Sequence, residues 1–365
     1  MRIALLTIHH GNSYGGMLQA LASKLILSRY GEVTFLNYAS DYLSKTMRPV
    51  AFDASIGGVL RAAKNIARLG PRRRLLHRFR EFQDEHFPRT EWLRDSEALA
   101  RQEELFEIFV AGSDQIWNPA TVRSFDLAYF LDFVKTKPKI AFASSAGSYR
   151  YSAHQAKQVR RCLSSFSALG VREQDLNRYL TELLQRKDIR TVLDPTLMLT
   201  ADEWRDALSL RPDSSTERYL LVYALKLDRD GRKLVEKVSG QLGLPVVAID
   251  QEPILRYQAD RHVNDAGPKE CLDLLSNAAF VVTDSFHATA FSVNFQIPFL
   301  CITPRTGANR LITLLSAVGL ENLMGSDEID RSLGADFNRA RLLLSSLRHQ
   351  SLDFLSQSIN NAQQL

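Results

Sequence analysis

The sequence predicts an α/β protein with two doubly wound units, each a parallel sheet covered by helices on both faces. Two observations carry this prediction. Short, almost uninterrupted apolar runs alternate with helix-like segments from residue 3 onward, which is typical of buried parallel strands. The chain has 365 residues, and at about 150 residues per domain this length favours two domains.

The first half begins with a predicted strand at residues 3–8. A helix is predicted at 15–29, where Leu18, Leu21 and Leu25 recur at helical spacing. Further strands of this half are predicted at 32–38, 108–111, 139–144, 168–171 and 192–193.

The second half repeats this alternation after a polar, turn-rich stretch at 211–215, which we interpret as a linker. Its strands are predicted at 219–225, 245–249, 280–283 and 298–302, and a final helix at 337–358. We therefore expect an N-terminal domain over residues 1–205, a C-terminal domain over 216–336 and a helical tail over 337–365.

Composition excludes several classes of protein. Apolar residues make up 45% and charged residues 24%, so a disordered chain is excluded. The three cysteines are far apart and form no CxxC pair, which argues against disulfides and cysteine zinc sites and favours a reducing cytosol. The apolar run at 3–8 is too short for a signal peptide or a membrane span.

The net charge is only +5, yet residues 54–80 hold eight Lys or Arg and no acid. One interpretation is a solvated basic helix pair whose apolar side chains face inward. The other is a surface that attracts an anionic membrane, an anionic lipid-linked or polymeric substrate, or nucleic acid. No nucleic-acid-binding motif accompanies the stretch, so we expect no nucleic acid partner.

Three loops follow apolar strands, at the edge where open α/β sheets bind ligands. The first contains Asn12, Tyr14 and Gly15, before a helix whose N-terminus could hold an anion; a glycine-assisted turn explains it equally well. The second contains Ser113 and Asp114. Asp114 could accept a proton from a substrate hydroxyl, or it could cap the following turn.

The third loop contains Ser285, Phe286 and His287, directly before an apolar helix. A helix N-terminus favours neutral imidazole over imidazolium. A lone histidine is more often structural, but one beside hydroxyl residues at a strand end is a catalytic candidate. Arg172 also follows a strand, where its planar fork could bind a carboxylate or phosphate. Neither a GxSxG elbow nor an HExxH zinc motif occurs, so we expect no metal.

Taken in order, these segments resemble the polysaccharide pyruvyl transferase family over residues 1 to about 320. The segments that carry the resemblance are RIALLTIHHGNSYGGMLQA, VAGSDQIWNP, YFLDFV, KIAFASSAG, GVRE, LDPT, TDSFHATAFS and NRLITLLSAVGL. The resemblance implies a GT-B-like fold, with two Rossmann-like domains facing a central cleft and the last helix returning to the N-terminal domain.

The resemblance also implies a reaction. Phosphoenolpyruvate, as co-substrate and without a cofactor, donates pyruvate to two hydroxyls of one sugar, forming a cyclic ketal on a polysaccharide or lipid-linked oligosaccharide. Such an enzyme would act in exopolysaccharide biosynthesis, in the cytoplasm or at the inner face of the membrane. The N-terminal domain would hold the acceptor and the C-terminal domain the donor.

Residue by residue, the resemblance implies that Asp114, Arg172 and His287 hold the phosphoenolpyruvate donor. Because Asp114 and His287 each follow an apolar strand of a separate α/β unit, we expect them to face each other across the cleft. The family's Arg-Leu-His triplet is Ser-Phe-His here, so one arginine is missing, and Arg305 or Arg310 could replace it. Two other functions stay open: a GT-B glycosyltransferase that uses a nucleotide sugar, and a non-enzymatic anion-binding or nucleic-acid-binding protein.

Overall fold

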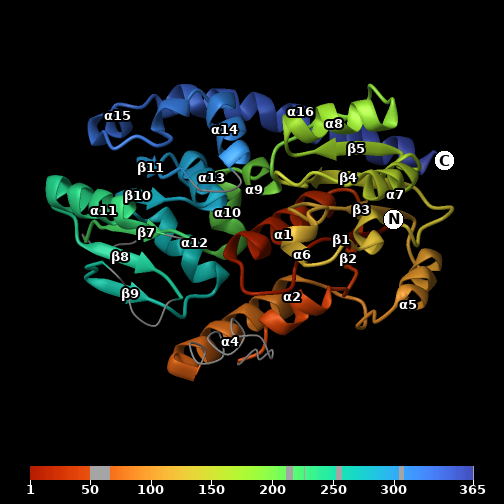
Figure 1. The fold of residues 1–365 in the computed structure, drawn as a ribbon, viewed down its shortest axis with the longest axis horizontal. Coiled ribbons are helices and arrows are strands. Elements are labelled where there is room, and N and C mark those ends of the chain that lie inside the picture. The colour runs from red at the N-terminus through yellow and green to blue at the C-terminus, as the bar shows by residue number, and fades with distance from the viewer. Residues whose placement is uncertain (50–65, 211–216, 226, 252–256, 304–307, 365) are drawn as a thin grey trace. The chain divides into compact units, whose positions relative to one another are not determined.

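The computed structural model describes residues 1–49, 66–210, 217–225, 227–251, 257–303 and 308–364. Their strands form two parallel sheets, which confirms the predicted α/β class (Figure 1). Contacts divide the chain into two units. The first unit comprises Met1–Thr46, Gln83–Met198 and Ser345–Leu365, and the second comprises Met47–Phe82 and Leu199–Leu344.

The first unit holds a six-stranded sheet in the order β2-β1-β3-β4-β5-β6. Its strands are β1 (Arg2–Leu6), β2 (Glu32–Phe35), β3 (Ile108–Ala111), β4 (Lys139–Ser144), β5 (Ala168–Val171) and β6 (Arg190–Thr191). Because β1 pairs with both β2 and β3, the strand order reverses there. In open α/β sheets such a reversal leaves a crevice that binds ligands.

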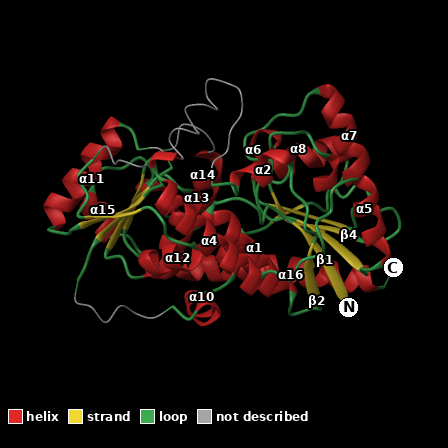
Figure 2. Cartoon of the chain, turned by 90° about the horizontal axis from the view of Figure 1, so that it is seen from below, coloured by secondary structure: helices red, strands yellow, loops and turns green. Residues whose placement is uncertain are grey.

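Helices cover both faces of this sheet. Figure 2 shows α1 (Tyr14–Leu27) and α16 (Phe337–Gln363) on one side, and α7 (Ala153–Leu163) and α8 (Gln174–Leu184) on the other. The other helices of this unit are α2 (Asp41–Thr46), α5 (Ser96–Ala100), α6 (Pro119–Val122), α9 (Pro195–Met198), and the short 3-10 turns η1 (Arg101–Glu104) and η2 (Leu127–Phe130).

The second unit holds a five-stranded sheet in the order β11-β10-β7-β8-β9. Its strands are β7 (Leu220–Tyr223), β8 (Val246–Ile249), β9 (Arg261–Val263), β10 (Phe280–Thr283) and β11 (Phe299–Cys301). Here the strand order reverses between β7 and β10. Apolar side chains from β7, β10 and the helix α11 (Arg229–Leu242) form the core.

The helices of the second unit connect these strands. They are α10 (Ala201–Leu208), α11 (Arg229–Leu242), α12 (Pro268–Ser276), α13 (Phe286–Phe295), α14 (Ala308–Ala317), η3 (Glu321–Leu323) and α15 (Ile329–Leu333). Helix α4 (Leu69–His86) and helix α16 each contribute residues to both units. Among the described residues, no helix is both long and apolar enough to span a membrane.

The structure differs from the sequence prediction at the ends of several strands. The first two strands end at Leu6 and Phe35, earlier than expected, because the chain turns into the polar loops there. The predicted strand at 192–193 lies two residues earlier in β6, although the Val192 amide still donates to the Val171 carbonyl. Strand β9 was not predicted, because its three residues include only one aliphatic side chain.

The basic stretch belongs to a different unit from the one predicted. We expected residues 54–80 in the N-terminal domain, but 47–82 groups with the second unit. The reason is a set of contacts made by α4: Arg74 Nε lies 2.6 Å from Asp265 Oδ2, and Arg78 Nη1 lies 3.3 Å from Asp265 Oδ1. Residues 50–65, including Arg61 and Lys64, lie outside the described part of the chain.

Most of the described cations of this stretch have partners within the protein. Arg72 is buried and donates to the carbonyls of Arg48 and Pro49, and burial lowers its pKa to about 10. Arg68 and Arg80 also donate to backbone carbonyls. Arg73 alone, among the described cations of 54–80, is exposed with no polar partner. These arginines therefore bind α4 to Asp265 and to the backbone of residues 47–49.

Candidate functional site

In the first unit, the loops after β1 and β3 meet at the point where the strand order reverses. The Thr7 hydroxyl donates to the Ser113 carbonyl over 3.0 Å and so ties the two loops together. The side chain of Gln19, on α1, donates to the Thr7 hydroxyl and to the Ile8 carbonyl. The sequence-predicted residues Ser113 and Asp114 therefore lie at the ligand-binding edge of the sheet.

The backbone after β3 has a conformation that only certain residues tolerate. Gly112 has a φ of +119°, a left-handed value that residues with a side chain rarely adopt, and a Cβ there would lie 2.3 Å from the Phe142 carbonyl oxygen. Asp114 is also left-handed, with φ 68°, and its carbonyl accepts from the Ser145 amide. This turn directs the Asp114 side chain to Arg172, whose Nη2 lies 3.2 Å from Asp114 Oδ1.

Arg172 is the centre of a buried charge cluster. Its side chain is 3% exposed and forms ion pairs with three carboxylates, those of Asp114, Glu173 and Asp194. Burial alone lowers the pKa of Arg172, but Asp194, Asp114 and Glu173 together raise it above its ordinary value. The guanidinium therefore stays charged, and the carboxylates outnumber it.

This cluster surrounds the arginine whose fork we predicted to bind a substrate anion, a role that stays a prediction. The structure shows that the guanidinium pairs with three carboxylates. It holds Asp114, whose side chain is 13% exposed and is the most accessible of the three carboxylates. Ser113 likewise has a structural role, because its buried hydroxyl donates to the Ala143 carbonyl.

Sequence reasoning missed two members of this cluster. Glu173 accepts a hydrogen bond from the Ser145 hydroxyl, and Asp194 accepts from the backbone and hydroxyl of Thr196, over 2.9 and 2.6 Å. Both carboxylates follow predicted strands, and this position was the one sign in the sequence that they belong to the site. Their spatial convergence on Arg172 could not be read from the sequence.

The loop after β1 presents the start of α1. Ser13 caps this helix, because its hydroxyl accepts from the Gly16 amide over 3.3 Å. The predicted residues Tyr14 and Gly15 are buried in the first turn, while Asn12 is half-buried before it. The loop thus places a helix N-terminus at the same sheet edge as Asp114.

In the second unit, the loops after β7 and β10 meet in the same way. The Thr283 hydroxyl donates to the Tyr223 carbonyl over 2.5 Å, and Asp284 Oδ1 accepts from the Leu225 amide over 2.6 Å. Ser285 caps α13, because its hydroxyl accepts from the Ala288 amide. The predicted residue Ser285 is therefore buried and holds the start of the helix.

The first turn of α13 brings Phe286 and His287 together with Arg310. The ring centroids of Phe286 and His287 lie 5.3 Å apart, and the Arg310 guanidinium lies 5.3 Å from the Phe286 centroid. His287 is half-buried, with its Nε2 shielded from solvent, and Phe286 is buried. A cation, an imidazole and a helix N-terminus thus share one place, which suits an anionic ligand. Arg305, the other predicted arginine, lies outside the described residues.

The two units differ in the charged side chains at their ligand-binding edges, although each edge holds a helix N-terminus and the second also holds Asp284. In the first unit three carboxylates surround one arginine, whereas the second unit presents Arg310 beside the N-terminus of α13. Among the described residues, no group of three or more His, Cys, Asp or Glu side chains is placed to hold a metal ion.

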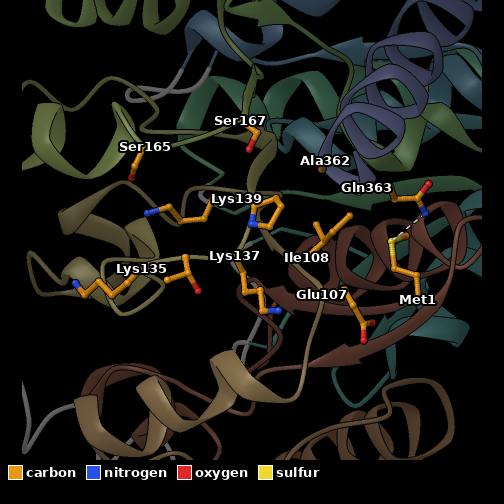
Figure 3. Close-up of a pocket in the computed structure, with 12 residues that line it drawn as sticks. Met1, Glu107, Ile108, Lys135, Lys137, Lys139, Ser165, Ser167, Ala362 and Gln363 are labelled. Carbon is orange, nitrogen blue, oxygen red and sulfur yellow. Dashed lines mark hydrogen bonds between the residues drawn. The ribbon is translucent and has the colours of Figure 1, made fainter. Parts of the chain in front are cut away.

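A groove of about 710 Å³ lies at the opposite edge of the first sheet, where strands begin. Lys135, Lys137 and Lys139 line it, together with Met1 and Gln363. Figure 3 shows the Lys137 ammonium pointing away from those of Lys135 and Lys139, so the three do not surround a common point. Open α/β sheets bind ligands at the other edge, and this groove is not our candidate site.

A family model described as polysaccharide pyruvyl transferase matches residues 14–305, a range that contains Asp114, Arg172 and His287. A comparison with curated protein sequences finds no significant match.

Solved structures match over nearly the whole chain. A UDP-GlcNAc 2-epimerase from Methanocaldococcus jannaschii is 10% identical with a TM-score of 0.53, and the alignment covers 91% of each chain. A UDP-GlcNAc 2-epimerase from Neisseria meningitidis, solved with UDP-GlcNAc, has the same identity and TM-score, over 99% of this chain and 100% of that one. At this identity the likeness shows the fold alone, and it confirms the predicted GT-B-like class.

Proposed function

The chain belongs to the polysaccharide pyruvyl transferase family, and from this premise we propose that it transfers pyruvate from phosphoenolpyruvate to a sugar. The acceptor is a sugar of a polysaccharide or of a lipid-linked oligosaccharide, and two of its hydroxyls become bridged by a cyclic ketal. No cofactor takes part, and phosphoenolpyruvate is the co-substrate.

The proposed reaction balances without an oxidant or reductant. The first sugar oxygen bonds to C2 of phosphoenolpyruvate while C3 gains a proton and becomes a methyl group. The C2–O bond to phosphate then breaks, and the second sugar oxygen bonds to C2. Of the two protons that the hydroxyls lose, the methyl group gains the equivalent of one and the released phosphate takes the other.

The second unit suits the donor. Phosphoenolpyruvate carries a phosphate and a carboxylate, which Arg310 and the N-terminus of α13 can hold. His287, in the first turn of this helix, is the residue we assign to proton transfer at C3. This assignment places the proton donor beside the bound anion.

The first unit suits the acceptor. A neutral sugar is not repelled by the carboxylates around Arg172, and Asp114 can accept a hydroxyl proton. Arg172 holds Asp114 in place. The N-terminus of α1, with Asn12 before it, lies at the same sheet edge and offers further hydrogen-bond donors.

One observation carries this assignment: three carboxylates surround the single arginine of the first unit, whereas in the second unit Arg310 lies over Phe286, at the start of α13. A donor with several negative charges is disfavoured where carboxylates outnumber the cation, and an uncharged acceptor is not.

A transfer assay tests the function and its independence of metal. The purified protein is incubated with phosphoenolpyruvate and a panel of neutral oligosaccharides, and both released phosphate and the pyruvate ketal are measured. We expect equal rates with and without a chelator, because arginine and backbone amides neutralise the donor. Loss of activity on chelation, restored by one divalent ion, would contradict the metal-free mechanism. Absence of the pyruvate ketal with every acceptor would contradict the proposed pyruvyl transfer.

Thermal unfolding of the same protein distinguishes pyruvyl transfer from the alternative activity, glycosyl transfer from a nucleotide sugar. A GT-B glycosyltransferase would be stabilised by a nucleotide or nucleotide sugar, whereas the proposed enzyme is stabilised by phosphoenolpyruvate. The rise in melting temperature with each ligand, at equal concentration, separates these two functions.

We also propose that the enzyme works at the inner face of a membrane, with the basic stretch 54–80 as the contact. Within the described residues only Arg73 of this stretch is exposed without a partner, so we assign the contact to Arg73 together with Arg61 and Lys64. Changing all three to glutamine should weaken binding to anionic vesicles at low salt, by about 1 kcal/mol per residue, and less at high salt.

Co-sedimentation with vesicles measures this effect. A variant with Lys157→Gln and Arg160→Gln, two exposed positions on α7, is the control and should sediment like the wild type. Equal sedimentation of the wild type and the triple variant at low salt contradicts the membrane contact. A large loss of phosphoenolpyruvate affinity would instead place the stretch at the active site.

A further inference from the structure

An exposed tryptophan lies at the carboxyl edge of the first sheet. Trp92 is 41% exposed, whereas Trp117 and Trp204 are buried. Its segment runs beside β2, because the Phe35 amide donates to the Pro88 carbonyl and the Leu93 amide donates to the Asn37 carbonyl over 3.0 Å. Trp92 is thus held by the backbone at the end of β2 while its indole faces solvent.

One histidine, His10, lies against this indole, and a second, His9, packs on His10. The ring centroids of His10 and Trp92 are 5.2 Å apart, and those of His9 and His10 are 4.0 Å apart. Burial lowers the pKa of both, that of His9 to about 4, so both rings are neutral at pH 7. His9 Nδ1 lies 3.0 Å from the Thr7 carbonyl and therefore donates to it, which leaves Nε2 as an acceptor.

Three buried polar atoms of this region have no hydrogen-bond partner among the described residues. They are Nε2 of His9, Nε2 of His10 and Oδ1 of Asn37. A buried polar group left unpaired costs about 1–3 kcal/mol, so native proteins rarely retain three together without a function. His9 is completely buried, whereas His10 and Asn37 are only partly buried, so a ligand that carries several hydroxyl groups can pair with these two side chains.

We propose that Trp92, His10 and Asn37 form a carbohydrate subsite that binds a sugar of the acceptor chain. A pyranose has one face of C–H groups, which packs on an indole, and a rim of hydroxyls, which bond to imidazole and amide side chains. These three side chains are all neutral at pH 7, which suits an uncharged sugar better than an ion. This inference rests on the proposed function for the identity of the chain being bound.

The position of the subsite agrees with an acceptor chain. His10 is followed directly by the loop that contains Asn12 and by Ser13, the cap of α1. One end of the loop therefore carries the subsite and the other the helix N-terminus that we assign to the acceptor. The subsite holds a neighbouring sugar of the polymer and not the sugar that reacts.

Quenching of tryptophan fluorescence tests binding without requiring transfer. Acrylamide should quench Trp92 in the wild type, because the other two tryptophans are buried. Cellotetraose, maltotetraose and chitotetraose are the probes, with glycerol at equal hydroxyl concentration as the control. We expect at least one tetrasaccharide to protect Trp92 from acrylamide, and Trp92→Phe to remove the quenchable signal.

Kinetics test the subsite in the working enzyme. Trp92→Ala should raise the acceptor KM about tenfold while the phosphoenolpyruvate KM and kcat change less than about twofold, because only acceptor stacking is lost. His10→Phe and Asn37→Ala should raise the same KM. Leu105→Ala, which truncates an exposed side chain before β3 at the opposite edge of the sheet, should leave it unchanged.

The outcomes separate the two proposals. An inactive wild type whose Trp92 is still protected by a tetrasaccharide refutes the pyruvyl transfer and supports the subsite. An active wild type refutes the subsite if Trp92→Ala leaves the acceptor KM within threefold and no tetrasaccharide protects Trp92 more than glycerol does. Melting curves of the variants exclude unfolding as the cause of a raised KM.

Discussion

Replacing His287 by alanine is expected to reduce the rate of pyruvyl transfer by about 10²–10⁴-fold, the usual contribution of a positioned acid or base. The physical reason is that C3 of phosphoenolpyruvate must gain a proton as the sugar oxygen bonds to C2. His287 lies in the first turn of α13, where its ring contacts that of Phe286. The Arg310 guanidinium lies over the Phe286 ring. The measurement is kcat from ketal formation at saturating phosphoenolpyruvate.

Controls separate chemistry from folding and from donor binding. His287 is only half-buried, so the variant should melt within a few degrees of the wild type. His349→Ala, at an exposed position on α16, should keep full activity. Phosphoenolpyruvate should still raise the melting temperature of His287→Ala, because Arg310 and the helix N-terminus remain. If the variant retains more than about a tenth of the activity, His287 is not the essential acid or base.

Replacing Arg172 by methionine is expected to destabilise the first unit by about 3–5 kcal/mol, which is typical of removing one partner from a buried ion pair. The variant leaves Asp114, Glu173 and Asp194 in a buried place without their cation. Urea unfolding followed through Trp117, which is buried in the same unit, measures the loss.

Two further variants keep this prediction testable if the methionine variant does not fold. Arg172→Lys retains the charge but not the three-sided fork, so its loss of stability should be intermediate. Arg160→Met removes an exposed arginine of the same unit and should change stability by less than about 0.5 kcal/mol. A loss below about 1 kcal/mol for Arg172→Met would contradict the buried cluster.

Much of the fold could be predicted from local sequence patterns. Buried parallel strands require apolar side chains on both faces, so runs such as 108–111 and 280–283 are recognisable without any partner strand. Strand β9 escaped prediction because its side chains are half-exposed at the edge of the second sheet. Its position depends on pairing with β8, which no local pattern encodes.

The candidate site was predictable in part. Asp114 and His287 follow apolar strands, and the carboxyl end of such a strand is where α/β proteins place ligand-binding residues. The substrate-binding role of Arg172 stays a prediction, and its three carboxylate partners could not be read from the sequence, because an arginine after a strand looks the same whether it meets a substrate or carboxylates. The basic stretch was placed in the wrong unit for a similar reason, since Asp265 lies far from it in sequence.

The sequence by itself determined the two parallel sheets, the loops that carry Asp114 and His287, and the family. These follow from hydrophobic periodicity and motif order, which are local properties of the chain. Only the tertiary structure decided that Arg172 pairs with Asp114, that Arg310 lies over Phe286, and that His10, Asn37 and Trp92 gather at one sheet edge. Ion pairs and ring contacts act over a few ångströms, so they depend on which strand ends the fold brings together.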